Sequence, residues 1–185
     1  MMKSALRLSA LAAAVSAFAF TAQAKNPMVG GAAMYPTKDI VQNAMNSKDH
    51  TTLVTAVKAA GLVSTLEGKG PFTVFAPTNE AFAELPAGTI DALLKPENKA
   101  QLTKVLTCHV VAADALAKTV AKMIKADGGE HDIKTVGGCM LKAKESMGKI
   151  TLTDENGDVA HVTIADVKQS NGVIHVVDRV LLPKM

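Results

Sequence analysis

Residues 70–82 (GPFTVFAPTNEAF) constrain the fold of this chain more than any other stretch, because their pattern changes from that of a strand to that of a helix. Residues 72–75 form a β-branched and aromatic run after Gly-Pro, which predicts a short buried strand. Pro77 should end that strand, since proline has no N–H to donate to a ladder. Thr78 can then cap a new helix with its side-chain oxygen, and Glu80 suits the positive end of the same helix.

This stretch also holds three of the four aromatic residues that lie outside the N-terminal leader, the fourth being Tyr35. We expect Phe72, Phe75 and Phe82 to pack on one another, because clustered apolar side chains are usually core. The simplest interpretation is therefore structural, with no chemistry at this strand-turn-helix unit.

Residues 1–24 have the features of a secretory signal peptide. Lys3 and Arg7 form its positive region, residues 8–20 its apolar core, and a small-x-small site (AQA) ends at Ala24. The apolar run is too short to span a bilayer as a helix, and no second long apolar run follows. We expect cleavage after Ala24 and a soluble product, periplasmic or secreted.

Charge and aromatic content exclude several classes of partner. The leader contributes two basic and no acidic side chains, so the formal net charge falls from +3 for the whole chain to about +1 after cleavage. No basic run or basic-aromatic interleaving occurs, which argues against nucleic acid. The scarcity of Tyr and the absence of Trp disfavour stacking platforms for sugars or single strands.

Two cysteines, Cys108 and Cys139, remain in a chain that we expect to be exported. The simplest interpretation is a disulfide, which would stabilise the fold by roughly 3–4 kcal/mol. Two buried thiols or a redox pair are the alternatives, although the spacing is far from the C-x-x-C of thiol oxidoreductases.

Composition divides the remaining chain into an extended arm at residues 25–36 and one domain at residues 37–183. The first part of the domain carries apolar stripes at helical spacing. Thr37 and Asp49 are placed to cap two of these helices, and Gly61 to end one in a left-handed conformation.

The helical pattern continues after the predicted strand at residues 72–75, with proline boundaries and one further short strand. Pro86 ends one helix, and Pro96 begins another. Residues 108–111 predict a brief strand, and Asp114 is placed to cap a further helix.

The last third of the chain changes to strand patterns. Asn-Gly pairs occur twice between apolar runs, a strong hairpin signal. Helices segregated from such a set of strands indicate an α+β fold. The expected strands cover residues 133–136, 140–144, 149–153, 159–165 and 173–182.

No residue pattern predicts a catalytic, cofactor or metal site. Alternating acidic and amide residues at 154–158 faintly resemble a calcium loop, but the glycine is displaced and the distant glutamate is missing. Residues 129–132 (GEHD) lack a second histidine at zinc spacing. His161 and His175 lie near acidic residues, yet no G-x-S-x-G elbow supplies a nucleophile, and Ser170 suits a turn. His109 is best interpreted as a buried hydrogen-bonding residue.

Two segments carry a family resemblance. Residues 72–82 (FTVFAPTNEAF) resemble the first signature of the fasciclin domain, and residues 171–183 (NGVIHVVDRVLLP) resemble the second. Between them, residues 109–111 lie where the family has its Tyr-His segment. The resemblance covers about residues 37–183, and the single-domain exported form is similar to bacterial secreted fasciclin proteins.

The resemblance implies a wedge-like β-sandwich with flanking helices and the two signatures as adjacent core strands. Its motif and structural residues would be Phe75, Pro77, Thr78, Asn79, Phe82, His109, Asn171, Gly172, His175 and Asp178. Thr78 and His109 are expected to serve the fold through hydrogen bonds. In animals, domains of this family bind integrins partly through the Tyr-His segment. Here Cys108 stands in the place of the tyrosine, which argues against an integrin-type surface. The same cysteine would let this strand be tied to Cys139.

For function, the resemblance implies a non-enzymatic monomer that mediates adhesion or protein–protein interaction with a protein or matrix partner. The expected contact edge includes His109, Val110 and Asp114. One alternative is a carrier of small molecules or lipids, because methionine-rich segments can line adaptable pockets. A second alternative, an ester hydrolase, has no motif in its favour. The carrier idea depends on Met28, Met34, Met45, Met123, Met140 and Met147.

Overall fold

The structure is a computed structural model that describes residues 26–184. The predicted leader and its cleavage site lie outside the described residues. In chain order the elements are β1 (Met28–Val29), β2 (Ala32–Ala33), α1 (Ile40–Asn46), the 3₁₀ helix η1 (Lys48–His50), α2 (Thr51–Ala60), α3 (Val63–Leu66), β3 (Phe72–Pro77), α4 (Asn79–Ala83), α5 (Thr89–Leu93), the 3₁₀ helix η2 (Pro96–Asn98), α6 (Lys99–Thr107), β4 (Val110–Val111), α7 (Ala117–Ala126), β5 (His131–Lys134), β6 (Met140–Ser146), β7 (Lys149–Thr153), β8 (Val159–Gln169) and β9 (Gly172–Val177).

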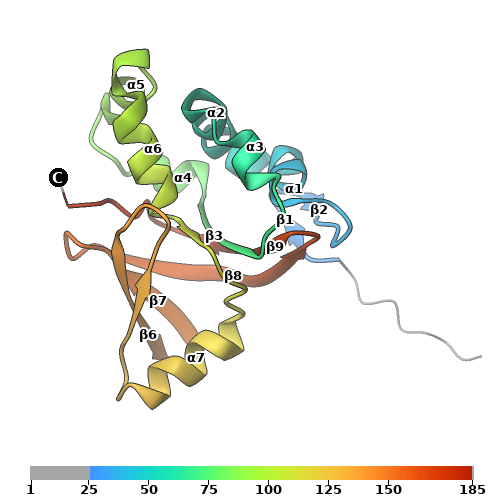
Figure 1. Ribbon diagram of the computed structural model, residues 1–185, viewed down its shortest axis with the longest axis vertical. Coiled ribbons are helices and arrows are strands. Elements are labelled where there is room, and N and C mark those ends of the chain that lie inside the picture. Colours follow the sequence, from blue (N-terminus) through green and yellow to red (C-terminus); the bar gives the residue numbers. More distant parts are fainter. Residues whose placement is uncertain (1–25, 185) are drawn as a thin grey trace, which may run out of the picture.

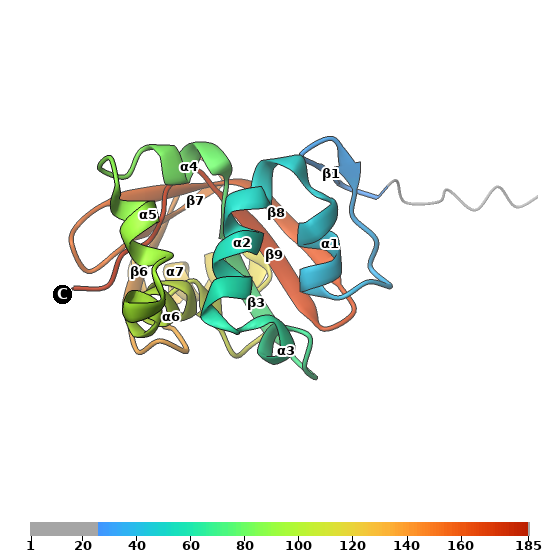
Figure 2. The ribbon, with the colours of Figure 1, turned by 90° about the horizontal axis from the view of Figure 1, so that it is seen from above.

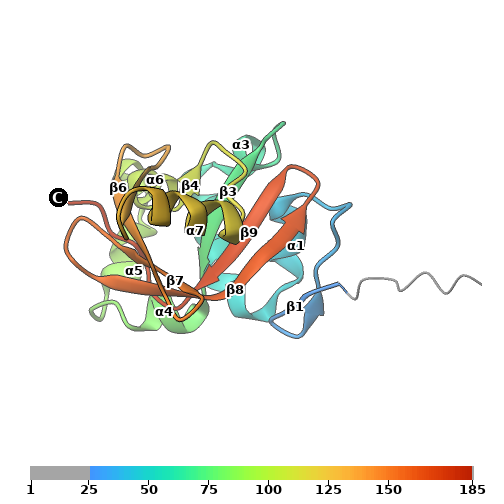
Figure 3. The ribbon, with the colours of Figure 1, turned by 90° about the horizontal axis from the view of Figure 1, so that it is seen from below.

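A seven-stranded mixed sheet forms the centre of the molecule, in the order β4-β3-β9-β8-β7-β6-β5. The two signature strands, β3 and β9, are neighbours and run parallel, with Phe72 opposite Gly172 and Pro77 opposite Val177. The other pairs in this sheet are antiparallel. Helices α1 to α6 lie on one side of β3 and β9, and α7 lies on the other (Figures 1 and 3). The expected α+β class is confirmed.

The sheet bends at β8. The ladder between β8 and β9 changes register twice, between Val162 and Ile164 and again between Ile164 and Val167. Asp166, inside the second irregularity, has a φ of 57°. Because such bulges bend a strand, β5 to β7 turn back toward β3 and β9 and form the second layer of a sandwich.

Two hydrophobic cores lie on opposite faces of the signature strands. Val74 and Ile174 face α1, α2 and α6 in the first core. Phe75 and Val177 face the second core, where Leu152 and residues of β5, β6, β8 and α7 enclose them. Since successive side chains of a strand point to opposite faces, the two signatures form the wall between both cores.

This alternation overturns the expected phenylalanine cluster. Phe82 and the half-buried Phe72 belong to the first core, but Phe75 lies in the second, where its ring stacks on His175 with 5.7 Å between centroids. Phe72 and Phe75 are an odd number of positions apart, so a strand cannot present both to one side.

Most expected elements are present, with changes at their ends. Thr78 caps α4 through a 3.2 Å bond from the Ala81 amide, and Gly61 ends α2 with a φ of 73°. The expected caps at Thr37 and Asp49 were wrong. Asp39 caps α1 in a capping box with Gln42, and α2 follows directly from η1.

The segment expected to be an extended arm is instead a hairpin on the first core. Strands β1 and β2 pair antiparallel, and Val29 and Met34 are buried among the residues of α1 and α2. Figure 2 shows this hairpin beside α1 at the edge of the helical layer. Within residues 26–184, no helix has both the length and the apolar character needed to cross a membrane.

Candidate functional site

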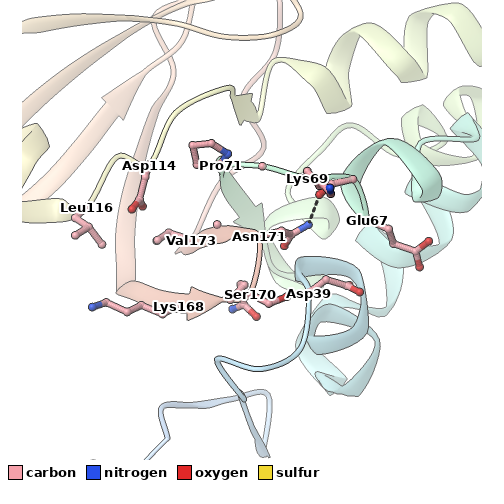
Figure 4. A pocket seen from close by; sticks show the side chains of 14 residues that line it. Asp39, Glu67, Lys69, Pro71, Asp114, Leu116, Lys168, Ser170, Asn171 and Val173 are labelled. Carbon is pink, nitrogen blue, oxygen red and sulfur yellow. Dashed lines mark hydrogen bonds between the residues drawn. The ribbon is translucent and has the colours of Figure 1, made fainter.

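A groove lies where three connections meet at one end of β3 and β9. These connections are the α3–β3 loop, the β8–β9 turn and the segment between β4 and α7. The groove has a volume of about 650 Å³ and is open to solvent. We call it the Asn171 groove because Asn171 lies in its middle, with Asp114 and Leu116 on one side and Glu67 on the other (Figure 4). Its lining is Asp39, Glu67, Gly68, Lys69, Gly70, Pro71, Asp114, Leu116, Lys168, Gln169, Ser170, Asn171, Gly172 and Val173.

Asn171 fixes the floor of this groove by binding two helix ends. Its Oδ1 accepts a hydrogen bond from the Ile40 amide at 3.1 Å, which is the first amide of α1. Its Nδ2 donates to the carbonyl oxygens of Leu66 at 2.7 Å and Gly68 at 3.1 Å, at the end of α3. One side chain therefore satisfies backbone groups that short helices leave unpaired.

Two glycines allow the signature strands to meet here. A Cβ at Gly70 would lie 1.9 Å from the Asn171 carbonyl oxygen, and a Cβ at Gly172 would lie 1.9 Å from that of Phe72. The Phe72 amide donates to the Asn171 oxygen at 3.1 Å across the same gap. Any larger residue would push the two strands apart, so both positions need glycine.

Side chains of the sheet bind the segment that carries Asp114 through hydrogen bonds. The Thr73 hydroxyl donates to the Ala113 oxygen at 2.6 Å and accepts from the Ala115 amide at 2.8 Å. Asp166 accepts from the Ala117 amide at 2.7 Å and so caps α7 from another strand. The expected cap, Asp114, makes no cap bond to α7 and is exposed. Its carboxylate is displayed on a fixed backbone at the edge of the groove.

His175 completes this support from the second signature. It is 2% exposed, its Nδ1 accepts from the Asp166 amide at 3.2 Å, and its Nε2 lies 2.8 Å from the Ala115 oxygen. These partners require the proton on Nε2. Burial lowers the pKa of His175, so the ring is neutral and acts as a structural link.

His109 and Val110, which the sequence suggested as contact residues, are buried and cannot reach a partner in this structure. The His109 Nδ1 donates to the Val105 oxygen at 2.9 Å, and its Nε2 accepts from the Leu181 amide at 2.9 Å. Desolvation lowers the pKa of His109 to about 4. Of the three residues expected at the contact edge, Asp114 alone lies on the surface.

Cys108 and Cys139 form a disulfide that joins the end of α6 to the turn between β5 and β6, with Cα atoms 5.4 Å apart. Backbone bonds reinforce the same junction. The Gly137 amide donates to Thr107 at 3.0 Å, and the Val136 amide donates to Val110 at 2.7 Å. The bridge thus connects the helical layer to the second layer of the sandwich.

The polar residues of the first signature also support helices. Asn79 accepts from the Thr52 amide at 3.0 Å and donates to the Lys48 oxygen at 2.9 Å, so it caps α2 from outside. Asp178, in the second signature, accepts from the backbone amide of His161 at 2.7 Å and from its Nδ1 at 3.0 Å. These side chains hold elements together and leave the groove surface to other residues.

The calcium-like loop and the carrier pocket that the sequence raised both fall on described residues. Within residues 26–184, no three or more His, Cys, Asp or Glu side chains come together. Both carboxylate oxygens of Asp154 accept backbone amides, including that of Leu182 at 2.8 Å. The apolar cavity beneath α1 to α3 holds about 40 Å³, below the roughly 300–1,000 Å³ of most small-molecule sites. The Asn171 groove, at about 650 Å³, lies within that range, but its lining is mainly polar and charged.

Sequence reasoning missed several residues that build the site. Thr73 and Asp166 position the Asp114 segment, and Lys69 and Lys168 line the groove. Aspartate is disfavoured inside strands, so Asp166 within a strand pattern was the one available signal of a bulge. The lysines carry no pattern that separates them from other surface lysines.

Comparisons with known proteins agree with this architecture. The family model described as the fasciclin domain matches residues 48–183. Protein sll1483 from Synechocystis sp. is 47% identical over 161 residues, covering 87% of this chain and 82% of that protein. Immunogenic protein MPB70 from Mycobacterium bovis is 34% identical over 145 residues, covering 76% of this chain and 66% of that protein.

A solved structure shares the fold. A FAS1 domain pair from the insect cell adhesion molecule Fasciclin I superposes with a TM-score of 0.68 at 18% identity. The match covers 78% of this chain and 51% of that chain, so this chain spans about half of the domain pair. At this identity, the likeness shows the fold alone.

Proposed function

Because the chain belongs to the fasciclin domain family, whose members generally act in adhesion and protein interaction, we propose that it is an exported, non-enzymatic interaction module that contacts a protein partner through the Asn171 groove. The family gives the kind of function. The location on the molecule is inferred from the geometry of the groove.

The observation that carries this proposal is the contrast between the groove surface and its support. Asp114, Lys69 and Lys168 present charges of both signs to solvent. Beneath them, buried or half-buried polar groups fix the backbone, as Asn171 and Thr73 do. A rigid backbone that displays polar side chains lowers the entropy cost of binding a protein surface.

The predicted export agrees with the same function. The predicted signal peptide would deliver the chain to an oxidising compartment, where the Cys108–Cys139 bridge is stable. Residues 25 onward would then be the mature protein. Intact mass of the protein recovered from the periplasm tests this step, because cleavage after Ala24 leaves Lys25 as the first residue.

The groove is tested by site-specific photo-crosslinking in cells that make the full chain. A photoreactive phenylalanine replaces Asp114 in one variant and Lys168 in another. Matched controls replace Asp91 on α5 and Lys149 on β7, which are exposed and lie outside the groove lining. We expect the same protein adduct from both groove positions and none from the controls.

A charge test uses the same positions. Asp114→Lys should lower the yield of the adduct formed from position 168, whereas Asp91→Lys should leave it unchanged, because a reversed charge disturbs a partner only at the contact. Adducts of equal yield from groove and control positions would overturn the proposal, as would their absence at both groove positions in folded protein.

A further inference from the structure

Most methionines in the described part of the chain are exposed to solvent, which is unusual for large apolar side chains. Of the six within residues 26–184, Met34 is buried at 2% exposure, and the other five are 41% to 99% exposed. The exposed five are Met28, Met45, Met123, Met140 and Met147. They account for five of the eight large apolar side chains exposed in the described residues.

These five methionines come from different elements of the fold. Met28 belongs to β1, Met45 to α1, Met123 to α7 and Met140 to β6. Met147 occupies the turn between β6 and β7. What the five share is an accessible thioether, which is the group in a methionine that reacts with oxidants.

Met147 is the extreme case. It is 99% exposed and has a φ of 50° in the two-residue turn that joins Ser146 to Lys149. Glycine is favoured at such a position because it has no Cβ, and asparagine and aspartate are favoured because their short polar side chains tolerate positive φ. The chain thus presents a long apolar side chain to solvent at a place where local backbone preference favours a small or polar residue.

We propose that Met147 is a site of reversible oxidation by hydroperoxides, with Met28, Met45, Met123 and Met140 as slower sites, and that oxidation at these positions leaves the fold intact. The thioether sulfur attacks one peroxide oxygen, the O–O bond breaks, and an S–O bond forms. With hydrogen peroxide, the second oxygen leaves as water. Sulfur loses two electrons and the peroxide gains them.

Burial explains why the fold survives. Sulfoxide formation turns an apolar side chain into a polar one, which is disruptive where the side chain is packed. The exposed methionines keep most of that change in solvent. Met34 packs in the first core between the β1–β2 hairpin and α1, so its sulfoxide would place an unpaired polar group among apolar side chains.

The reverse reaction also favours exposed sites. A methionine sulfoxide reductase breaks the S–O bond, releases the oxygen as water and oxidises two of its own thiols to a disulfide. The enzyme must enclose the side chain. A turn that projects a fully exposed residue between two strands meets that requirement better than a residue within a helix or strand.

The test is a time course of the full-length folded protein in hydrogen peroxide, read by peptide mass mapping. We expect the Met147 sulfoxide first, the other four exposed sites next, and Met34 at least about tenfold more slowly. Protein with all five sites oxidised should keep its melting temperature within a few degrees. Reductases for both sulfoxide epimers, supplied with a thiol reductant, should restore Met147 fastest.

Two variants act as controls. Met147→Leu should remove the first product without changing the melting temperature. Met34→Leu should leave the early oxidation pattern unchanged. Oxidation of Met34 as fast as Met147 in folded protein would overturn the proposal. So would unfolding on oxidation of the exposed sites, or a Met147 sulfoxide that resists both reductases.

Discussion

The helical half and the strand half of the molecule are held together by different kinds of contact. In the helical half, the short helices α1, α2 and α3 begin or end at side chains from distant parts of the chain. Asn171 binds α1 and α3, and Asn79 binds the start of α2. These bonds are half-buried and use backbone groups that have few other partners.

In the strand half, neighbours in sequence pair with one another. Strands β5, β6, β7 and β8 follow in order through short turns. Their polar surface carries exposed ion pairs, such as Glu130 with Lys142 at 2.7 Å and with Lys144 at 2.9 Å. The difference shows that a polar side chain stabilises this protein mainly through the backbone groups that it hydrogen-bonds. Its charge contributes much less.

The disulfide joins the two halves, so its loss should have the largest effect. The double variant C108S/C139S should lose about 3–4 kcal/mol of unfolding free energy, because the bridge closes a loop with a sequence separation of 31. Urea unfolding with and without reductant measures this. Equal midpoints in both conditions, together with two thiols that alkylate without reduction, would contradict the account.

Acid should weaken the protein next most strongly, through the buried histidines. The folded pKa of His109 is about 4, below its ordinary value of 6.5, so the unfolded state binds a proton first as pH falls. Stability is therefore full above about pH 6.5 and declines toward pH 4, by about 2–3 kcal/mol for this residue. Burial lowers the pKa values of His175 and His50 in the same direction.

The control for this pH dependence is His109→Gln, which does not titrate. It should be less stable than the wild type at pH 7, yet lose less stability between pH 6.5 and pH 4.5 in urea unfolding. An unchanged slope would mean that other groups govern acid sensitivity.

Asn171→Ala should come third, with a loss of about 2 kcal/mol, because it leaves the Ile40 amide and the Leu66 oxygen without their side-chain partner. The neighbouring Ser170→Ala is the matched control and should change stability by less than about 0.5 kcal/mol. Thermal unfolding of both variants decides the point. Similar losses of stability in the two variants would show that any substitution in this turn is destabilising, and that the hydrogen bonds of the Asn171 side chain are not the cause.

Glu130→Gln should have the smallest effect. The carboxylate binds two lysines, and the hydrogen bond from Lys142 lowers the pKa of Glu130, but solvent screens the pair. We expect no measurable shift in melting temperature at physiological salt. A shift comparable to that of Asn171→Ala would break the contrast between the two halves.

Local patterns in the sequence predicted the elements of the fold well. The hairpins around the two Asn-Gly pairs and the Thr78 cap depend on neighbouring residues, and the structure has them. The expected phenylalanine cluster rested on composition, whereas strand alternation, which the sequence also carries, places the Phe75 ring in the other core.

The candidate site was less predictable. The family resemblance marked Asn171 and Gly172, but the bonds of Asn171 reach residues more than 100 positions away. Asp166 caps α7 across 49 positions, which no local cap rule describes. His109 and Val110 are buried, and the His109 ring is hydrogen-bonded to α6 and to the C-terminal segment. Of the three residues that we expected at the contact edge, only Asp114 is exposed.

The central claim, that side chains of the signatures cap the short helices from outside, is tested most directly by amide hydrogen exchange. The first amides of a helix normally exchange fast, because they lack an intrahelical acceptor. The account predicts slow exchange at Ile40 and Thr52, lost at Ile40 in Asn171→Ala and at Thr52 in Asn79→Ala, with each variant leaving the other amide protected. Fast exchange at both amides in the folded wild-type protein would contradict it.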